Sequence, residues 1–175
     1  MTSTMGQLIL GTILDTDGAR ATCRLSLAQL ASARELAKVE HQAAVSVGGV
    51  VKVSVAGQLL FGMISELSTD RDDPESALAG IDYMGEGPCG PDGNALGFRR
   101  GLSIYPQPGD EVRFATETDF VRIFAPPDLP HIQLGTVYPT ENVRAPILFD
   151  MLMGRHFAVV GSSGTGKSTT VSLLL

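Results

Sequence analysis

Tryptophan is absent from the 175 residues, aromatic side chains make up only 6%, and there are only two cysteines. Cys23 and Cys89 lie far apart, with no C-x-x-C pair or Cys/His cluster, so neither a disulfide scaffold nor a zinc site is indicated. No apolar run approaches the roughly 20 residues that cross a bilayer, and no basic region precedes the first short apolar segment. We therefore expect a cytoplasmic protein with no membrane partner.

Positive charge is also scarce, because 13 Lys and Arg face 19 Asp and Glu for a formal net charge of -6. Broad nucleic-acid binding depends on basic side chains that neutralise phosphates, so the composition argues against it. A ring-shaped binder can confine its basic residues to a few loops, so a DNA contact is not excluded. With 43% hydrophobic and 18% charged residues, the chain has the composition of a folded protein.

Short strands and turns dominate residues 1–128, which predicts a small, closed or nearly closed β-barrel in a mainly β protein. Apolar and polar residues alternate along 20–27, as in a half-buried strand. Residues 50–67 read as a hairpin that turns at Ala56-Gly57, and 110–124 read as a second hairpin around a polar turn at 116–119. Pro108-Gly109 fits the centre of a type II turn.

Three further segments complete this prediction. Residues 27–38 form the one possible helix of the first part. The stretch 70–97 is rich in Asp, Gly and Pro, and we expect one strand around 81–84 followed by an exposed loop. Proline is unfavourable both inside a helix and in the hydrogen-bonded interior of a sheet, and this segment contains Pro126, Pro127 and Pro130. We therefore place a domain boundary there, between a barrel of residues 1–128 and a second unit of residues 129–175.

The stretch "HFAVVGSSGTGKSTT" carries the strongest signal, because Gly161, Gly166, Lys167 and Ser168 satisfy G-x-x-x-x-G-K-[ST]. We expect a short buried strand at 156–160 before the loop and a helix after it. Backbone N–H groups would then hold phosphates, Lys167 would reach the β- and γ-phosphates of ATP, and Ser168 would bind Mg²⁺. The predicted nucleotide-binding residues are Gly161, Ser162, Ser163, Gly164, Thr165, Gly166, Lys167, Ser168 and Thr169, with a further α-phosphate contact from Thr169 or Thr170.

Hydrolysis needs more than this loop: an acid on a second strand, a residue that orients water, and an arginine finger. The sequence offers no candidate for these roles, so no catalytic residue is assigned. A parallel strand also needs paired neighbours and covered faces, and residues 129–175 supply only one such strand. We therefore expect this chain to be the front of a longer protein and to be inactive alone.

Two segments resemble a known family. "GFRRGLSIYPQPGDEV" resembles the signature of the HAS barrel, and "IQLGTVYPTENVRAPILFDMLMGRHFAVVGSSGTGKST" resembles the entry into the RecA-like core of HerA-type ATPases. The resemblance implies a hexameric ATP-driven DNA translocase or helicase that works with a partner nuclease or other effector in DNA end processing, repair or bacterial antiviral defence. It assigns Lys167 and Ser168 to phosphate and magnesium, and it implies DNA contact only for a part of the family's core that has no matching positions here.

Two other functions stay open. The resemblance also implies that the barrel sits on one face of the ring, where it assists assembly and docks the partner, so the chain would then be an assembly module without catalysis of its own. A rotary-ATPase-type subunit also begins with a small barrel before a nucleotide loop.

Several polar residues have simpler interpretations. His41, His131 and His156 are scattered, and we expect structural roles for all three, with packing or hydrogen bonding for His156. Arg99 and Arg100 suit either a salt bridge between subunits or a solvated strand end. The acidic run at 70–73 lacks the pattern of a calcium loop and predicts a polar turn. Cys23 should act as a small hydrophobic residue.

Overall fold

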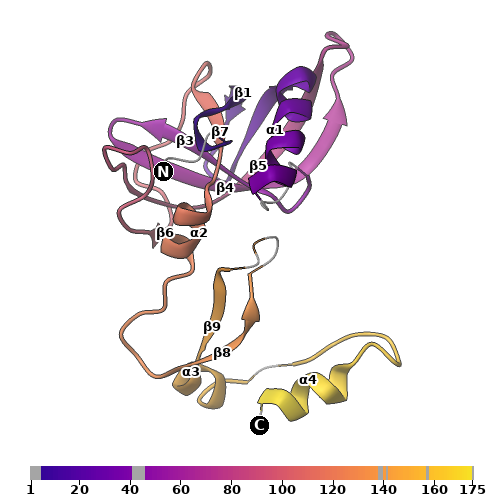
Figure 1. Cartoon of the computed structure of the whole chain (residues 1–175), viewed down its shortest axis with the longest axis vertical. Coiled ribbons are helices and arrows are strands. Elements are labelled where there is room, and N and C mark those ends of the chain that lie inside the picture. Colours follow the sequence, from indigo (N-terminus) through magenta and orange to yellow (C-terminus); the bar gives the residue numbers. More distant parts are fainter. Residues whose placement is uncertain (1–4, 41–45, 138–139, 141, 157, 175) are drawn as a thin grey trace.

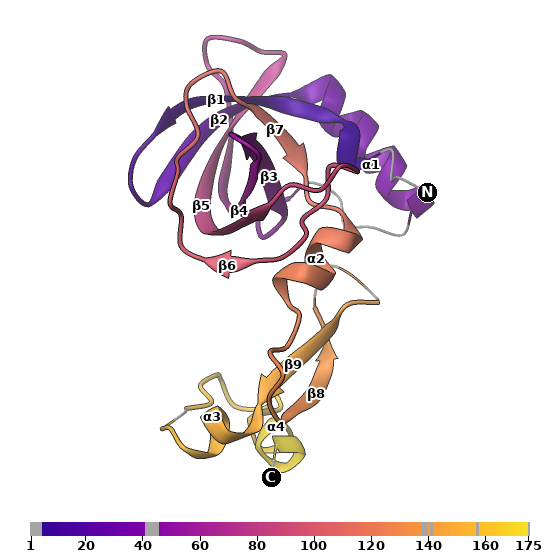
Figure 2. The ribbon, with the colours of Figure 1, turned by 90° about the vertical axis from the view of Figure 1, so that its left-hand side faces the viewer.

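The computed structural model describes residues 5–40, 46–137, 140, 142–156 and 158–174. The chain is mainly β, as the sequence predicts, and begins with an antiparallel barrel (Figures 1 and 2). Its elements begin with a 3-10 turn at Met5–Gln7 and continue with β1 (Ile9–Thr16), β2 (Arg20–Ser26), α1 (Leu27–Glu40), β3 (Val50–Val55), β4 (Gln58–Thr69), β5 (Ser76–Pro88), β6 (Arg99–Arg100) and β7 (Glu111–Phe114).

Six strands close the barrel in the order β2-β1-β7-β3-β4-β5, and β5 returns to pair with β2. All these pairings are antiparallel. Closure leaves these six strands without a long free edge, which is the usual solution for a small all-β domain. The short β6 adds to β5 outside this ring, through Arg99 and Arg100.

Two turns of the barrel lie where the sequence predicts them. Ala56 and Gly57 both have positive φ, at 47° and 78°, as a two-residue hairpin between β3 and β4 requires. Asp110 N donates to Gln107 O at 3.0 Å across Pro108 and Gly109, and Gly109 has a φ of 97°. Both predicted turns are confirmed.

The barrel encloses the first of two apolar clusters. Along β2 the residues Ala21, Cys23 and Leu25 are buried, which confirms the predicted alternation, although β2 ends at Ser26 and Leu27 already begins α1. The helix α1, predicted at 27–38, places Leu30 and Ala33 in the same cluster. The remaining buried members are Leu10, Ile13, Val51, Val53, Ile64, Ala77, Ala79, Ile81, Val112 and Phe114.

A second apolar cluster covers the outer face of β3 and β4. The next element, α2 (Glu117–Ile123), contributes Phe120 and Ile123 to it. The rest of its buried residues come from the two strands, from the segment after β5, from the residue after β7 and from a later hairpin, namely Val50, Leu59, Phe61, Ala95, Ala115 and Val143. The residues Val50–Val53 of β3 are therefore all buried, with opposite faces in different clusters.

One prediction for this region is wrong, and a second holds only in part. The residues expected as the second strand of the 110–124 hairpin form the helix α2, because Phe120 and Ile123 are spaced for one helical face. Thr116 and Asp119, expected in a turn, form the capping box of that helix. The segment after β5 is not simply an exposed loop, since Ala95 is 3% exposed and belongs to the second cluster. The predicted strand at 81–84 is confirmed and is part of the longer β5.

After α2 the chain leaves the barrel through the proline-containing segment 124–130 (Figure 1). It then forms a two-stranded hairpin of β8 (His131–Thr136) and β9 (Arg144–Leu148), followed by α3 (Phe149–Met153) and α4 (Lys167–Leu174). This part begins a partial α/β unit, and α4 lies far from the barrel in both views (Figures 1 and 2).

Candidate nucleotide-binding site

The predicted phosphate loop lies directly before α4, which begins at Lys167. Gly164 and Gly166 have φ values of 81° and 84°, a left-handed backbone that glycine adopts without a steric penalty. The two glycines turn the chain twice within three residues and lead it into the helix. A side chain at either position would strain this path.

Two side chains fix the shape of the loop by binding the same backbone oxygen. Thr165 Oγ1 donates to the Ser162 carbonyl oxygen at 2.7 Å. Lys167 Nζ donates to that oxygen as well, so the ammonium group is folded back onto the loop. The sequence motif places Lys167 at the site, but the role of Thr165 in holding the loop emerges only from the geometry.

The start of α4 supplies the partial positive charge of a helix N-terminus. Thr170 N donates to Gly166 O at 2.9 Å, the first backbone bond of the helix. An α-helix leaves the N–H groups of its first turn without intrahelical partners, and here these groups belong to Lys167, Ser168 and Thr169. Together with the Lys167 ammonium, they form an electropositive site for an anion.

The two threonines after Ser168 differ in availability. Thr170 Oγ1 donates to Gly166 O at 3.1 Å, which commits its hydroxyl to the helix backbone. Thr169 is exposed. Thr170 is exposed too, so the two candidates for an additional phosphate contact differ in that only the Thr170 hydroxyl is bound to the helix backbone.

The expected buried strand at 156–160 is wrong. Residues 158–160 form no strand, and Val160 is 88% exposed. An apolar segment becomes a buried strand only when neighbouring strands pair with it and other elements cover it. The described neighbours are a separate two-stranded hairpin and two short helices, which provide no such partners within the described residues.

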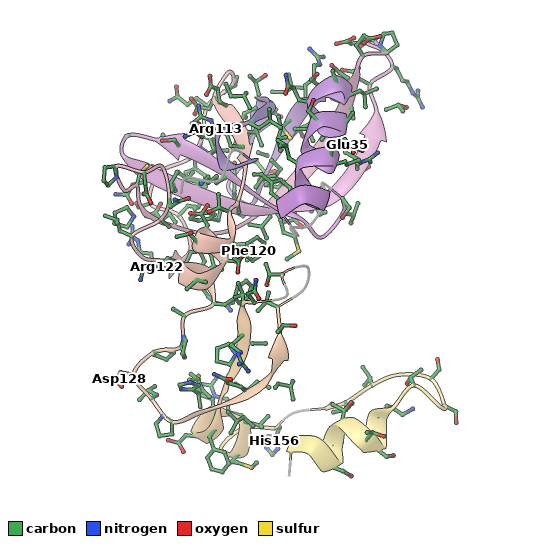
Figure 3. All side chains as sticks on the ribbon, viewed as in Figure 1. Glu35, Arg113, Phe120, Arg122, Asp128 and His156 are labelled. Atoms are coloured by element: carbon green, nitrogen blue, oxygen red, sulfur yellow. The ribbon has the colours of Figure 1, made fainter. Side chains whose placement is uncertain are left out.

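Neither of the described histidines joins the loop. His156, which is labelled in Figure 3, is exposed, so the expected packing role is not observed. His131 Nδ1 lies 3.0 Å from the Leu129 carbonyl oxygen, a local contact at the start of β8. His41 lies outside the described residues. Within the described part of the chain, no group of three His, Cys, Asp or Glu side chains is arranged to hold a metal ion.

The arginines of β6 do not act alike. Arg99 forms an ion pair with the buried Glu86 of the same chain, and Ser103 donates to Glu86 through both its backbone N, at 2.9 Å, and its Oγ, at 2.6 Å. Burial raises the pKa of Glu86, but the hydrogen bonds from Ser103 and then Arg99 outweigh it and lower this pKa to about 2. Arg100 is exposed, as expected of a strand end.

The acidic run forms the predicted polar turn between β4 and β5. Asp70 accepts hydrogen bonds from Asp72 N at 3.0 Å and from Arg24 Nε at 2.8 Å, and the hydrogen bond from Asp72 N is the main reason why its pKa is lowered. Asp73 accepts from Ser76 Oγ at 2.7 Å. Cys23 is fully buried, and burial raises its pKa to about 12, which confirms that it acts as a small hydrophobic residue.

The segment that contains the loop is similar to known proteins. Residues 132–175 match the family model for the central domain of helicase HerA. The chain is also 34% identical over 130 residues to the "Probable DNA double-strand break repair helicase HerA" of Methanocaldococcus jannaschii, a match that spans 71% of this chain and 22% of that protein. These matches relate the chain to the HerA-type ATPases and confirm the resemblance seen in its sequence.

Proposed function

We propose that the complete polypeptide is an ATP-driven, ring-forming translocase or helicase of double-stranded DNA, and that this chain supplies its barrel and phosphate loop. The observation that carries the proposal is the G-x-x-x-x-G-K-S loop at the N-terminus of α4, within the segment that matches the HerA central domain. The chain spans about a fifth of the length of the HerA relative, so activity, substrate and partners are all part of the proposal.

The loop residues fit a magnesium-bound triphosphate. Residues 161–166 are exposed and offer a turned backbone, and the N–H groups at the start of α4 point along the helix axis toward it. Lys167 would exchange the Ser162 carbonyl for β- and γ-phosphate oxygens, and the Ser168 hydroxyl would hold Mg²⁺. MgATP would supply the phosphoryl bond whose hydrolysis drives movement. The residues from Gly161 to Ser163 and Thr169 would complete the cradle.

The proposal divides the chain near 128, with a HAS-like barrel at 1–128 and the start of a RecA-like ATPase unit at 129–175. Hydrolysis then needs groups from other parts of the complete polypeptide, so residues 1–175 alone would not turn over ATP. A homo-hexamer would enclose the DNA, and a nuclease or another effector would dock on the barrel face. Such a machine would act in DNA end processing or in defence. None of the helices in the described residues could span a membrane.

An assembly module without catalysis is the second candidate. The observation that favours it is that buried charged side chains of the barrel form ion pairs within the fold, which is a structural use of these groups. One assay of the complete polypeptide distinguishes the two candidate functions, namely ATP turnover with and without double-stranded DNA. We expect DNA to stimulate turnover and Lys167→Ala to abolish it while the oligomer mass stays unchanged. Turnover that survives in Lys167→Ala would reject the proposed motor.

A further inference from the structure

The hairpin that precedes the phosphate loop is buried only at its tip. Of the residues described after Ile123, Val143 alone is buried, with 3% of its surface exposed. Val143 O accepts a hydrogen bond from Val137 N at 2.8 Å, which closes the tip, and Val137 packs against the same cluster. The strands β8 and β9 themselves are largely exposed or half-buried. The tip is therefore the point at which this unit is attached to the barrel.

The surface that receives the tip belongs to the barrel. Val143 shares its cluster with Phe61 of β4 and with Phe120 of α2. Phe120 lies on the side of α2 that faces the hairpin (Figure 3). The chain enters β9 at Arg144, directly after Val143, and continues through α3 toward the phosphate loop. A displacement of the tip from the barrel would thus move the start of the segment that carries the loop.

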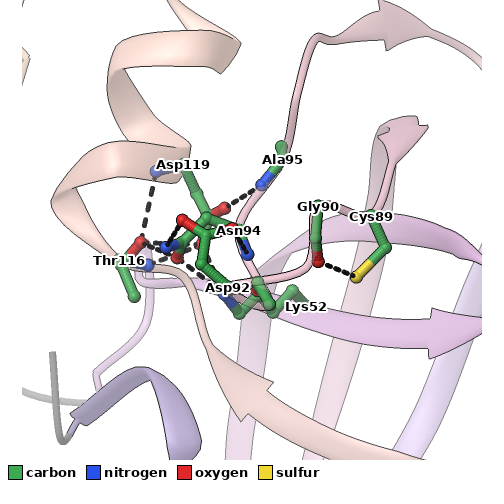
Figure 4. A network of polar contacts seen from close by, with 9 residues as sticks. Lys52, Cys89, Gly90, Asp92, Asn94, Ala95, Thr116 and Asp119 are labelled. Atoms are coloured by element: carbon green, nitrogen blue, oxygen red, sulfur yellow. Dashed lines mark hydrogen bonds and ion pairs between the residues drawn. The ribbon is translucent and has the colours of Figure 1, made fainter. Parts of the chain in front are cut away.

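A buried ion pair holds the receiving surface in one arrangement (Figure 4). Lys52 Nζ of β3 donates to Asp119 Oδ2 of α2 at 2.7 Å and to the Gly93 carbonyl oxygen at 2.8 Å. Asp119 Oδ1 accepts from Ala95 N at 2.8 Å. One ion pair therefore fixes a barrel strand, the segment after β5 and the first turn of α2 to one another, and all three carry members of the cluster that contains Val143.

We propose that the tip of the β8–β9 hairpin, which Val143 joins to the cluster of Phe61 and Phe120, is the contact through which the barrel sets the position and nucleotide affinity of the phosphate loop. If the tip leaves the barrel, a smaller fraction of molecules has the arrangement that binds nucleotide. The apparent dissociation constant for MgATP equals the intrinsic one divided by that fraction, so it rises. This inference rests on the proposed nucleotide-binding function. It adds that the barrel controls the loop from a distance, through a packed contact and not through a group that touches nucleotide.

The test uses the complete polypeptide with Val143→Asp and, as matched control, Val121→Asp, because Val121 lies on α2 but is 50% exposed. A carboxylate at Val143 would lose its hydration in an apolar cluster, so the tip should undock. We expect hydrogen exchange at Val137 N and Thr140 N to accelerate by about tenfold or more, since both close the tip. We expect the MgATP dissociation constant to rise about threefold or more. Val121→Asp should leave both unchanged.

The milder Val143→Ala should shift both quantities in the same direction by less, which guards against a general folding defect in Val143→Asp. Faster exchange at the tip with unchanged MgATP affinity would overturn the coupling. Unchanged exchange would overturn the docking itself. If the unmodified polypeptide binds no MgATP, the proposed function and the coupling both fail, and the exchange data still decide whether the tip docks.

Discussion

The ion pair between Lys52 and Asp119 gives a stability prediction that can be worked from the structure. Their side chains are 4% and 0% exposed, so removing one partner leaves a buried charge without compensation. Such a loss costs about 3–5 kcal/mol in free energy of unfolding. Asp119→Ala also removes the acceptor for Ala95 N and Thr116 N, which places it at the upper end of this range.

A double-mutant cycle separates the ion pair from the other contacts. Lys52→Met and Asp119→Ala should each cost about 3–5 kcal/mol, whereas the double variant should lose less than their sum by about 2 kcal/mol or more, because no unpaired charge remains. Asp128→Ala is the matched control, because Asp128 is exposed in the segment between α2 and β8, and we expect a change within about 0.5 kcal/mol.

Urea unfolding followed by far-ultraviolet circular dichroism is the suitable assay, since the chain has no tryptophan to report by fluorescence. A loss below about 1 kcal/mol in either single variant would show that water reaches the pair and screens it. Strict additivity in the double variant would show that Lys52 and Asp119 do not interact. Either result would refute the argument from burial.

Four further predictions follow from particular contacts. Gly87→Ala should destabilise the barrel by about 2 kcal/mol or more in urea unfolding, because a Cβ there would lie 1.9 Å from Gly97 O, whereas Gly18→Ala, where nothing lies within 4 Å, should not. Because the folded pKa of Glu86 is lowered to about 2, its contribution to stability is present above about pH 5 and is lost as pH falls toward 2, and Glu86→Gln should flatten that part of the stability profile. Thr165→Val should weaken MgATP binding several-fold and Thr165→Ser should restore it, because serine keeps and valine lacks the hydroxyl that donates to Ser162 O. A thiol reagent should label the half-buried Cys89 in the native chain well before Cys23, and equal rates would contradict the burial of Cys23.

Local chemistry made part of this fold predictable. Ala56-Gly57 and Pro108-Gly109 are turn pairs whose backbone preferences depend on few neighbours, so both turns could be placed from the sequence. The alternation of Ala21, Cys23 and Leu25 depends only on having one buried face. The glycines and Lys167 of the loop likewise act through local geometry, which is why the motif was enough to propose the site.

Features that depend on tertiary contacts were not predictable in the same way. Val121 and Ile123 suit a strand by propensity, although Thr116 and Asp119 form a capping pattern that points to the helix observed. Lysine is rarely buried, so nothing local indicates that Lys52 lies in the interior beside Asp119. The apolar residues before Gly161 read as a strand, but a strand needs a partner that the sequence of this segment does not specify.

The central claim is that residues 161–168 hold a magnesium-bound triphosphate, and calorimetric titration of the complete polypeptide with MgATP tests it most directly. The account predicts saturable binding that needs Mg²⁺ and that Lys167→Ala weakens at least tenfold, because the ammonium contacts phosphate oxygens. Equal MgATP affinity in the unmodified and Lys167→Ala proteins, or no binding in either, would contradict it.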